Sequence, residues 1–183
     1  NVPVNGVQIT VPFEKLEAEG GKYEEIKNAT KAGVDIKTDV TNDSDTEATG
    51  VSVKSTVYNK EGDVISTQTD DITVAAGKTE TISQSVDVAD PKLWSVDSPN
   101  LYWVRTEIIQ NGKVVDRTDS RFGIRYIATD PNSGFYLNGV HTKLNGVCEH
   151  SDLGSLGMET YQAAVDRRIR TLKKYGVNAI RTS

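Results

Sequence analysis

The sequence is poor in cysteine and in clustered metal-ligating residues. Its single cysteine, Cys148, excludes an internal disulfide and a zinc site built from several cysteines. His141 has no third ligand at a suitable spacing, so it does not indicate a metal site. We therefore expect no metal and no other cofactor.

Long apolar runs and clustered positive charge are also missing. No apolar run approaches the roughly 20 residues of a membrane-spanning helix. The 21 Lys and Arg residues are interspersed among 26 Asp and Glu residues, and the formal net charge is −5. Such a chain lacks the basic surface that neutralises phosphates. We expect neither a membrane nor a nucleic acid as a partner.

The length and the two ends set further limits. A chain of 183 residues can bury a substantial core, as one domain or as a domain and part of another. The residues after Asn1 show neither a basic nor a long apolar segment, so we expect no targeting segment there. The final "VNAIRTS" reads as a buried strand without a polar tail, which favours a chain cut within a larger domain.

Residues 1–128 show the alternation of short β-strands separated by turns. In residues 34–40, "VDIKTDV", apolar and polar side chains alternate, and Val51, Val53, Ser55 and Val57 share one face of another strand. The pair Asn111-Gly112 is a strong hairpin signal. About seven such strands predict an antiparallel β-sandwich in the immunoglobulin style.

The acidic stretch from residue 13 to 30 is weakly periodic. It predicts either a short helix or a hairpin that turns at Gly20-Gly21. A solvated surface is favoured over a binding role, because charged runs usually face water.

Residues 129–183 follow a different pattern. A hairpin is expected around Asn138-Gly139, then a strand, then a helix over residues 158–175 that ends at Gly176, and then the strand of "VNAIRTS". A strand, helix and strand in this order predict a parallel βαβ unit, which needs covering on both faces. A (β/α)₈ barrel takes about 250 residues, so this segment would supply about a fifth of one. We expect the sandwich of the same chain, or a neighbouring chain, to cover it.

Polar residues stand at the predicted ends of the two parallel strands, where barrel enzymes bind substrates. His150 is a candidate hydrogen-bonding or acid-base group, or a histidine satisfied by a neighbouring carboxylate. Asp152 is a candidate acceptor for sugar hydroxyls, or a turn residue. Arg181 is a candidate for orienting a carboxylate, or a partner in a structural ion pair.

Other residues favour structural roles. Glu149 and Asp152 lie on one loop and cannot face each other across a sugar, as a glycosidase pair must. Cys148 stands in an apolar strand and is expected in the core. Trp94 and Trp103 are expected to pack within the sandwich or between domains rather than to stack on sugars.

Several motifs together resemble those of one family. "DPKLWSVDSPNLY", "RFGIR", "GFYLNG", "KLNGVCEHSDLGSLG" and "NAIRTS" follow one another along the chain. In this order they resemble glycoside hydrolase family 2, and most closely its β-galactosidase branch. The resemblance covers the chain from about residue 48 to its end.

The resemblance implies a domain arrangement and a role for three residues. Family members carry a jelly roll, an immunoglobulin-like sandwich and a (β/α)₈ barrel, so residues 1–128 would be the sandwich and 129–183 the start of the barrel. His150 and Asp152 match pocket-lining positions, and Arg181 matches an arginine beneath the catalytic carboxylates. Where Asn145 stands, many members have a basic residue, so an ion pair made there by relatives is absent or replaced.

The resemblance also implies an activity. The complete protein would release terminal β-galactosyl residues with retention, using two glutamates on later barrel strands. Neither glutamate is in this chain, so it would hold no catalytic residue and be inactive alone. The carbohydrate substrate would be a partner of the complete protein, and a homo-oligomer through the incomplete barrel segment is a further expected partner. The alternatives are a β-glucuronidase or β-mannosidase of the same family, or a stand-alone sandwich that binds carbohydrate or protein.

Overall fold

The structure, a computed structural model, describes residues 1–150, 153–158 and 161–182. The chain forms two compact units. Unit 1 comprises residues 1–128 and 136–140, and unit 2 comprises residues 129–135 and the residues from 141 onward. Each unit is described by itself.

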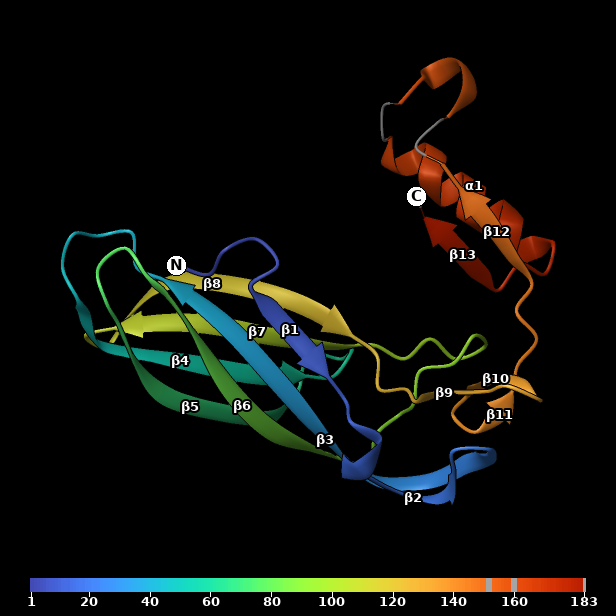
Figure 1. Cartoon of the computed structure of the whole chain (residues 1–183), viewed down its shortest axis with the longest axis horizontal. Coiled ribbons are helices and arrows are strands. Elements are labelled where there is room, and N and C mark those ends of the chain that lie inside the picture. The colour runs from blue at the N-terminus through green and yellow to red at the C-terminus, as the bar shows by residue number, and fades with distance from the viewer. Residues whose placement is uncertain (151–152, 159–160, 183) are drawn as a thin grey trace. The chain divides into compact units, whose positions relative to one another are not determined.

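Unit 1 is a sandwich of two antiparallel sheets, in agreement with the predicted mainly β fold (Figure 1). In the first sheet β3 pairs with β1, β2 and β6, and in the second the order is β5-β4-β7-β8. The strands are β1 (Val7–Thr10), β2 (Leu16–Gly21), β3 (Glu24–Thr41), β4 (Ala48–Tyr58), β5 (Val64–Val74), β6 (Thr79–Ala89), β7 (Tyr102–Gln110) and β8 (Lys113–Phe122).

The acidic stretch adopts the hairpin that the sequence offered as one of two alternatives. A 3₁₀ turn, η1 (Phe13–Lys15), leads into β2, and β2 pairs with β3. The chain reverses between Gly21 and Glu24, two residues later than the expected Gly20-Gly21 turn. Most of its charged side chains are exposed, as expected for a solvated face.

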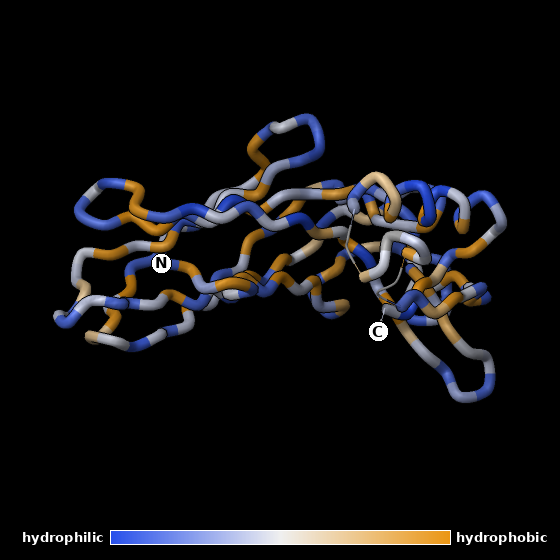
Figure 2. The backbone as a smooth tube through the Cα atoms, turned by 90° about the horizontal axis from the view of Figure 1, so that it is seen from above, coloured by the Kyte–Doolittle hydropathy of each residue, from blue (hydrophilic) through white to orange (hydrophobic). Residues whose placement is uncertain are grey.

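The alternation of side chains builds the core between the two sheets. Figure 2 shows hydrophobic and hydrophilic residues alternating along the strands. The four residues predicted to share one face of β4 are buried, and so are Val34, Ile36 and Val40 of β3. These side chains form two apolar clusters, one around Val34, Ile36 and Val104, and one around Val40, Val53 and Ile108.

A belt of four buried polar residues separates the two clusters. The belt consists of Thr38 on β3, Ser55 on β4, Gln84 on β6 and Thr106 on β7. On β3, β4 and β7 the belt residue stands between a side chain of one cluster and a side chain of the other.

The belt is only partly satisfied by hydrogen bonds. The Ser55 hydroxyl donates to the Gln84 side-chain oxygen at 2.7 Å, and the Gln84 amide donates to the Val53 carbonyl at 3.0 Å. Among the described residues, the hydroxyls of Thr38 and Thr106 have no hydrogen-bond partner. An unpaired buried hydroxyl costs free energy, whereas a paired one is close to neutral.

This difference predicts opposite effects for two neighbouring substitutions, since Ser55 and Thr106 lie opposite each other in register. Thr106→Val removes an unpaired hydroxyl and should raise the free energy of unfolding by about 1 kcal/mol. Ser55→Ala leaves the Gln84 oxygen without its donor and should lower it by about 1 to 2 kcal/mol. Urea denaturation of both variants measures the two shifts, and a less stable Thr106→Val would mean that this hydroxyl is paired.

Two Asn-Gly turns have nearly the same backbone but different surroundings. In Asn111-Gly112, which joins β7 to β8, the φ angles are 51° and 77°. In Asn138-Gly139, which joins β10 (Gly134–Leu137) to β11 (Val140–His141), they are 50° and 75°. Both hairpins were predicted, and positive φ at both turn residues suits the right-handed twist of the strands.

The two glycines differ in how closely other backbone approaches them. A Cβ on Gly139 would lie 1.9 Å from the Glu24 carbonyl oxygen, whereas one on Gly112 would meet nothing within 4 Å. The Ile26 amide also donates to the Asn138 carbonyl at 2.9 Å, so the turn is held against β3. β10 is the middle strand of a small sheet of order β11-β10-β9, with β9 at Ile127–Asp130.

The paired turns give a matched test of close backbone approach. Gly112→Ala should cost about 1 to 2 kcal/mol of stability, the strain of a left-handed alanine. Gly139→Ala carries the same strain and forces backbone apart, so it should cost roughly 1 to 3 kcal/mol more. Thermal denaturation of the two variants side by side measures the difference. Equal losses would show that the turn does not pack against Glu24.

Unit 2 contains a parallel βαβ arrangement. β12 (Gly146–Glu149) pairs in parallel with β13 (Ala179–Thr182), and α1 (Gln162–Lys174) lies between them in the chain, after the short η2 (Gly154–Leu156). The helix ends as predicted, because Gly176 has a φ of 82° and its amide donates to the Lys173 carbonyl. It begins at Gln162, later than the predicted residue 158, and residues 159–160 lie outside the described part of the chain.

The apolar stripe of α1 is only partly buried. Val165 and Leu172 are half-buried, whereas Ile169 is 46% exposed. On β13, Ile180 is 39% exposed. Within the described residues, no helix has the length and apolarity to cross a membrane.

Candidate functional site

The predicted site residues stand at the carboxyl ends of β12 and β13. His150 follows directly after β12, and Arg181 lies on β13, opposite Cys148 in the parallel register. Carboxyl ends of parallel strands meet at one edge of a sheet, so His150 and Arg181 lie near the same edge. Both are exposed. Asp152, the third predicted residue, lies outside the described residues.

The two faces of this sheet carry different chemistry. The Glu149 carboxylate pairs with the guanidinium of Arg168 on α1, so Glu149 points to the helix side. Because side chains alternate along a strand, Cys148 and its register partner Arg181 point to the opposite side. Arg181 makes no ion pair with any carboxylate of the described residues. Arg181 is thus a cation on the face away from the helix.

The face assignment also explains one wrong prediction. Cys148 was expected in the core, but it is exposed. Its strand is apolar, yet Cys148 shares the face of Arg181 rather than the helix-covered face of Glu149. Burial of that face needs a partner that these two strands and their helix do not supply.

Asn178 fixes the start of both strands, a role that sequence reasoning did not assign. Its side-chain oxygen accepts a hydrogen bond from the Asn145 amide at 2.8 Å, and its amide donates to the Lys143 carbonyl at 2.9 Å. The Asn178 backbone amide donates to the Asn145 carbonyl at 3.0 Å. The first residue of "NAIRTS" therefore sets the register in which Arg181 lies opposite Cys148.

Three of the motifs that are distant in sequence meet around Trp94 in unit 1. The Trp94 amide donates to the Ile124 carbonyl at 2.8 Å, and the Asn138 side chain donates to the Trp94 carbonyl at 2.9 Å. A Cβ on Gly123 would lie 2.9 Å from the Cβ of Trp94, so only glycine fits there. These contacts give "DPKLW", "RFGIR" and "GFYLNG" a structural role.

The second tryptophan does not follow the prediction of internal packing. Trp103 is 39% exposed on the outer face of the second sheet, and the Arg121 guanidinium lies 5.1 Å from the centre of its ring. It alternates with the buried Tyr102 and Val104, so strand geometry turns it outward.

A metal centre is not built by the residues that the structure describes. No group of three or more His, Cys, Asp or Glu side chains gathers in a metal-binding arrangement among them. His141 lies on β11, close to Gly134.

Comparison with known proteins gives consistent matches. A family model described as "Glycosyl hydrolases family 2" matches residues 22–125. A β-galactosidase from Bacteroides ovatus is 37% identical over 153 residues, which are 84% of this chain and 18% of that protein. A protein described as a putative β-glucuronidase from Formosa agariphila is 43% identical over 101 residues, 55% of this chain and 10% of that protein.

Solved structures agree with these sequence matches. A crystal structure of a glycosyl hydrolase family 2 member from Bacteroides cellulosilyticus has a TM-score of 0.83 and 31% identity, covering 97% of this chain and 23% of that one. A β-glucuronidase from Bacteroides uniformis has a TM-score of 0.80 and 27% identity, covering 98% of this chain and 20% of that one. The chain thus spans about a fifth of the length of these relatives.

The hydrogen bonds of Asn178 predict a local effect of its removal. Asn178→Ala deletes two side-chain hydrogen bonds, each with a net value of about 1 kcal/mol. The Asn145 amide should therefore exchange with solvent deuterium at least about tenfold faster, the equivalent of about 1.4 kcal/mol. The exposed Asn132 of the same unit provides the control Asn132→Ala, which should leave this exchange unchanged. Equal exchange rates of the Asn145 amide in both variants would rule out this role of the Asn178 side chain.

Proposed function

Since the chain belongs to glycosyl hydrolase family 2, we propose that it is part of a longer glycosidase that releases terminal β-galactosyl residues from β-galactosides. The match to the B. ovatus β-galactosidase supports this substrate, because at 37% identity it extends over 84% of the chain. The chain's share of its relatives' length supports the view that most of the enzyme lies outside residues 1–183.

In this proposal unit 1 is a support and unit 2 is the first βαβ unit of a (β/α)₈ barrel. The exposed apolar side chains of α1 and β13 require a cover, and further barrel strands and helices of the same protein provide it. A second copy of the chain at the same faces is the alternative cover. Arg181 then points into the barrel, because it lies on the face away from α1.

The proposed substrate contacts come from the strand ends. His150 and Asp152 would hydrogen-bond hydroxyl groups of the sugar, and Arg181 would orient a catalytic carboxylate by charge-assisted hydrogen bonds. Hydrolysis with retention needs two carboxyl groups about 5 to 5.5 Å apart, one as nucleophile and one as acid and base. Glu149 is held by Arg168 on the helix side, so both groups would come from outside residues 1–183.

A β-glucuronide is the second candidate substrate. The F. agariphila and B. uniformis relatives favour it, the first with the higher identity of 43% over a shorter stretch. The two substrates differ at C6, where a glucuronide carries a carboxylate and a galactoside a hydroxyl, and in the configuration of the hydroxyl at C4. A site built for one should reject the other strongly, because its polar groups would be left unpaired.

Hydrolysis assays on the full-length protein test the proposal. We expect turnover of 4-nitrophenyl β-D-galactoside with a kcat/KM at least about a hundredfold above that for the matching glucuronide, within the range of discrimination by a lost hydrogen bond. Residues 1–183 alone should hydrolyse neither. A preference for the glucuronide would make it the substrate in place of the galactoside. Turnover by residues 1–183 alone would contradict the proposal that both catalytic carboxyl groups lie outside these residues.

The role of Arg181 is tested in the same full-length protein. Arg181→Ala should lower kcat by roughly a hundredfold or more, as when an electrostatic group of an active site is removed. Arg170→Ala, which changes an exposed arginine on α1, is the matched control and should stay within about twofold of the unchanged protein.

A further inference from the structure

Unit 1 carries an open pocket that the proposed reaction does not use. Its volume is about 630 Å³, within the range of ligand pockets, and Trp94, around which the three motifs meet, is one of its lining residues. Its walls combine polar surface with apolar and aromatic side chains, among them Ile9, Phe13, Trp94, Leu101, Phe122 and Tyr126. Leu101 and Ile127 at the pocket are 37% and 47% exposed. Exposed apolar side chains around one concavity mark an interaction surface.

Two arginines line this pocket, and each is held over a tryptophan. The Arg121 guanidinium lies 5.1 Å from the ring centre of Trp103, and that of Arg125 lies 4.5 Å from the ring centre of Trp94. Stacking restricts the rotamers of a long side chain, and it leaves the N–H donors in the guanidinium plane available. Both arginines are thus positioned cations beside apolar side chains.

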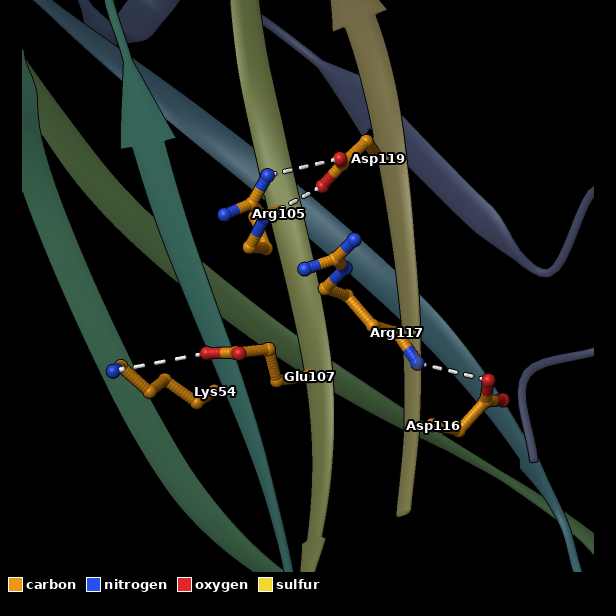
Figure 3. Close-up of polar contacts among 6 residues, drawn as sticks. All are labelled: Lys54, Arg105, Glu107, Asp116, Arg117 and Asp119. Carbon is orange, nitrogen blue, oxygen red and sulfur yellow. Dashed lines mark hydrogen bonds and ion pairs between the residues drawn. The ribbon is translucent and has the colours of Figure 1, made fainter. Parts of the chain in front are cut away.

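On the neighbouring part of the second sheet, by contrast, charged side chains form ion pairs. Figure 3 shows Arg105 and Asp119 on neighbouring strands, joined by two hydrogen bonds of 2.8 and 3.1 Å. The hydrogen bond from Arg105 holds the pKa of the Asp119 carboxyl below its usual value. Lys54 and Glu107 form a further pair at 3.7 Å. Within each of these pairs the positive and the negative charge neutralise each other.

Arg121 and Arg125 have no such neutralising partner. Across the residues that the structure describes, neither lies within 4.0 Å of a carboxylate oxygen. The chain has 26 acidic residues and a net charge of −5, so the missing partner does not reflect a shortage of acids. Two cations at this pocket favour an occupant that brings its own carboxylate.

We propose that this pocket is the docking site for a loop of the same protein that lies outside residues 1–183 and carries an Asp or Glu flanked by apolar side chains. The carboxylate would bind between Arg121 and Arg125, and the apolar side chains would cover Leu101 and Ile127. This inference rests on the proposed longer protein, since the relatives are more than four times as long as this chain.

The position of the pocket along the chain supports this occupant. Ile127 lies at the pocket, and the chain first leaves unit 1 directly after it, at Ala128, before residues 136–140 return to that unit. A later segment of the same protein is covalently tethered to the pocket, which gives it a higher effective concentration than a second copy of the chain. Arginine and aromatic residues are also enriched at the centres of protein interfaces.

Photo-cross-linking of the purified full-length protein identifies the occupant. The photoreactive residue p-benzoylphenylalanine replaces Ile127 in one variant and the exposed Val64 of β5, which lies outside the pocket, in a control. We expect the first to cross-link within the same molecule to a segment outside residues 1–183 that contains an Asp or Glu, and the control not to reach that segment. A cross-link to a second copy, to residues 1–183, or to nothing would overturn the proposal.

Charge reversal in the full-length protein tests the carboxylate. Lys113 provides the control, since it is exposed and lies on the same strand as Arg121 but outside the pocket. Arg121→Glu with Arg125→Glu should lower the melting temperature by roughly 4 °C or more relative to Lys113→Glu. Arg125→Lys, which keeps the charge, should lose less than Arg125→Gln. Equal shifts for pocket and control variants would overturn the charged contact.

These readouts are separate from those of the proposed activity. Cross-linking and melting temperature need no substrate, so a protein that prefers glucuronides, or hydrolyses neither sugar, can still confirm the docked loop. If the full-length protein hydrolyses galactosides but nothing cross-links at the pocket, the docking proposal is overturned and the proposed function is not.

Discussion

The hydrogen bond between Ser55 and Gln84 joins the two sheets through the middle of the core. A shift of either strand by one residue would turn its apolar face outward and leave these buried polar groups unpaired. The apolar clusters on both sides of the belt supply most of the favourable burial, and the polar belt specifies which strands face each other. The rigidity of unit 1, and of every surface it presents, depends on this register.

The rigid sandwich positions a junction of segments that are distant in sequence. Trp94 receives a hydrogen bond from Asn138 and donates one to Ile124, while Gly123 and Gly139 allow backbone and ring to approach closely. The motifs that most resemble the glycosidase family in this unit are therefore packing motifs. They position the pocket of Arg121 and Arg125 beside the place where the chain leaves the sandwich.

In unit 2 the two faces of the parallel sheet carry different charged side chains. The helix side holds Glu149 in an ion pair with Arg168, and the other side presents Arg181. Asn178 fixes the register on which this separation depends. In a glycosidase barrel that continued from these strands, Arg181 would lie on the inner face, and the reacting acids would come from later strands.

The sequence by itself determined the local structure: the alternating strands, the turns at Asn111-Gly112 and Asn138-Gly139, and the helix end at Gly176. Each depends on the backbone preferences of neighbouring residues, which a short stretch of sequence contains. Only the tertiary structure decided that Cys148 and Trp103 are exposed. It also decided the hydrogen bonds of Asn178 and the pocket lined by Arg121 and Arg125. Burial and pairing depend on which distant segment packs against a side chain, and no local pattern carries that information.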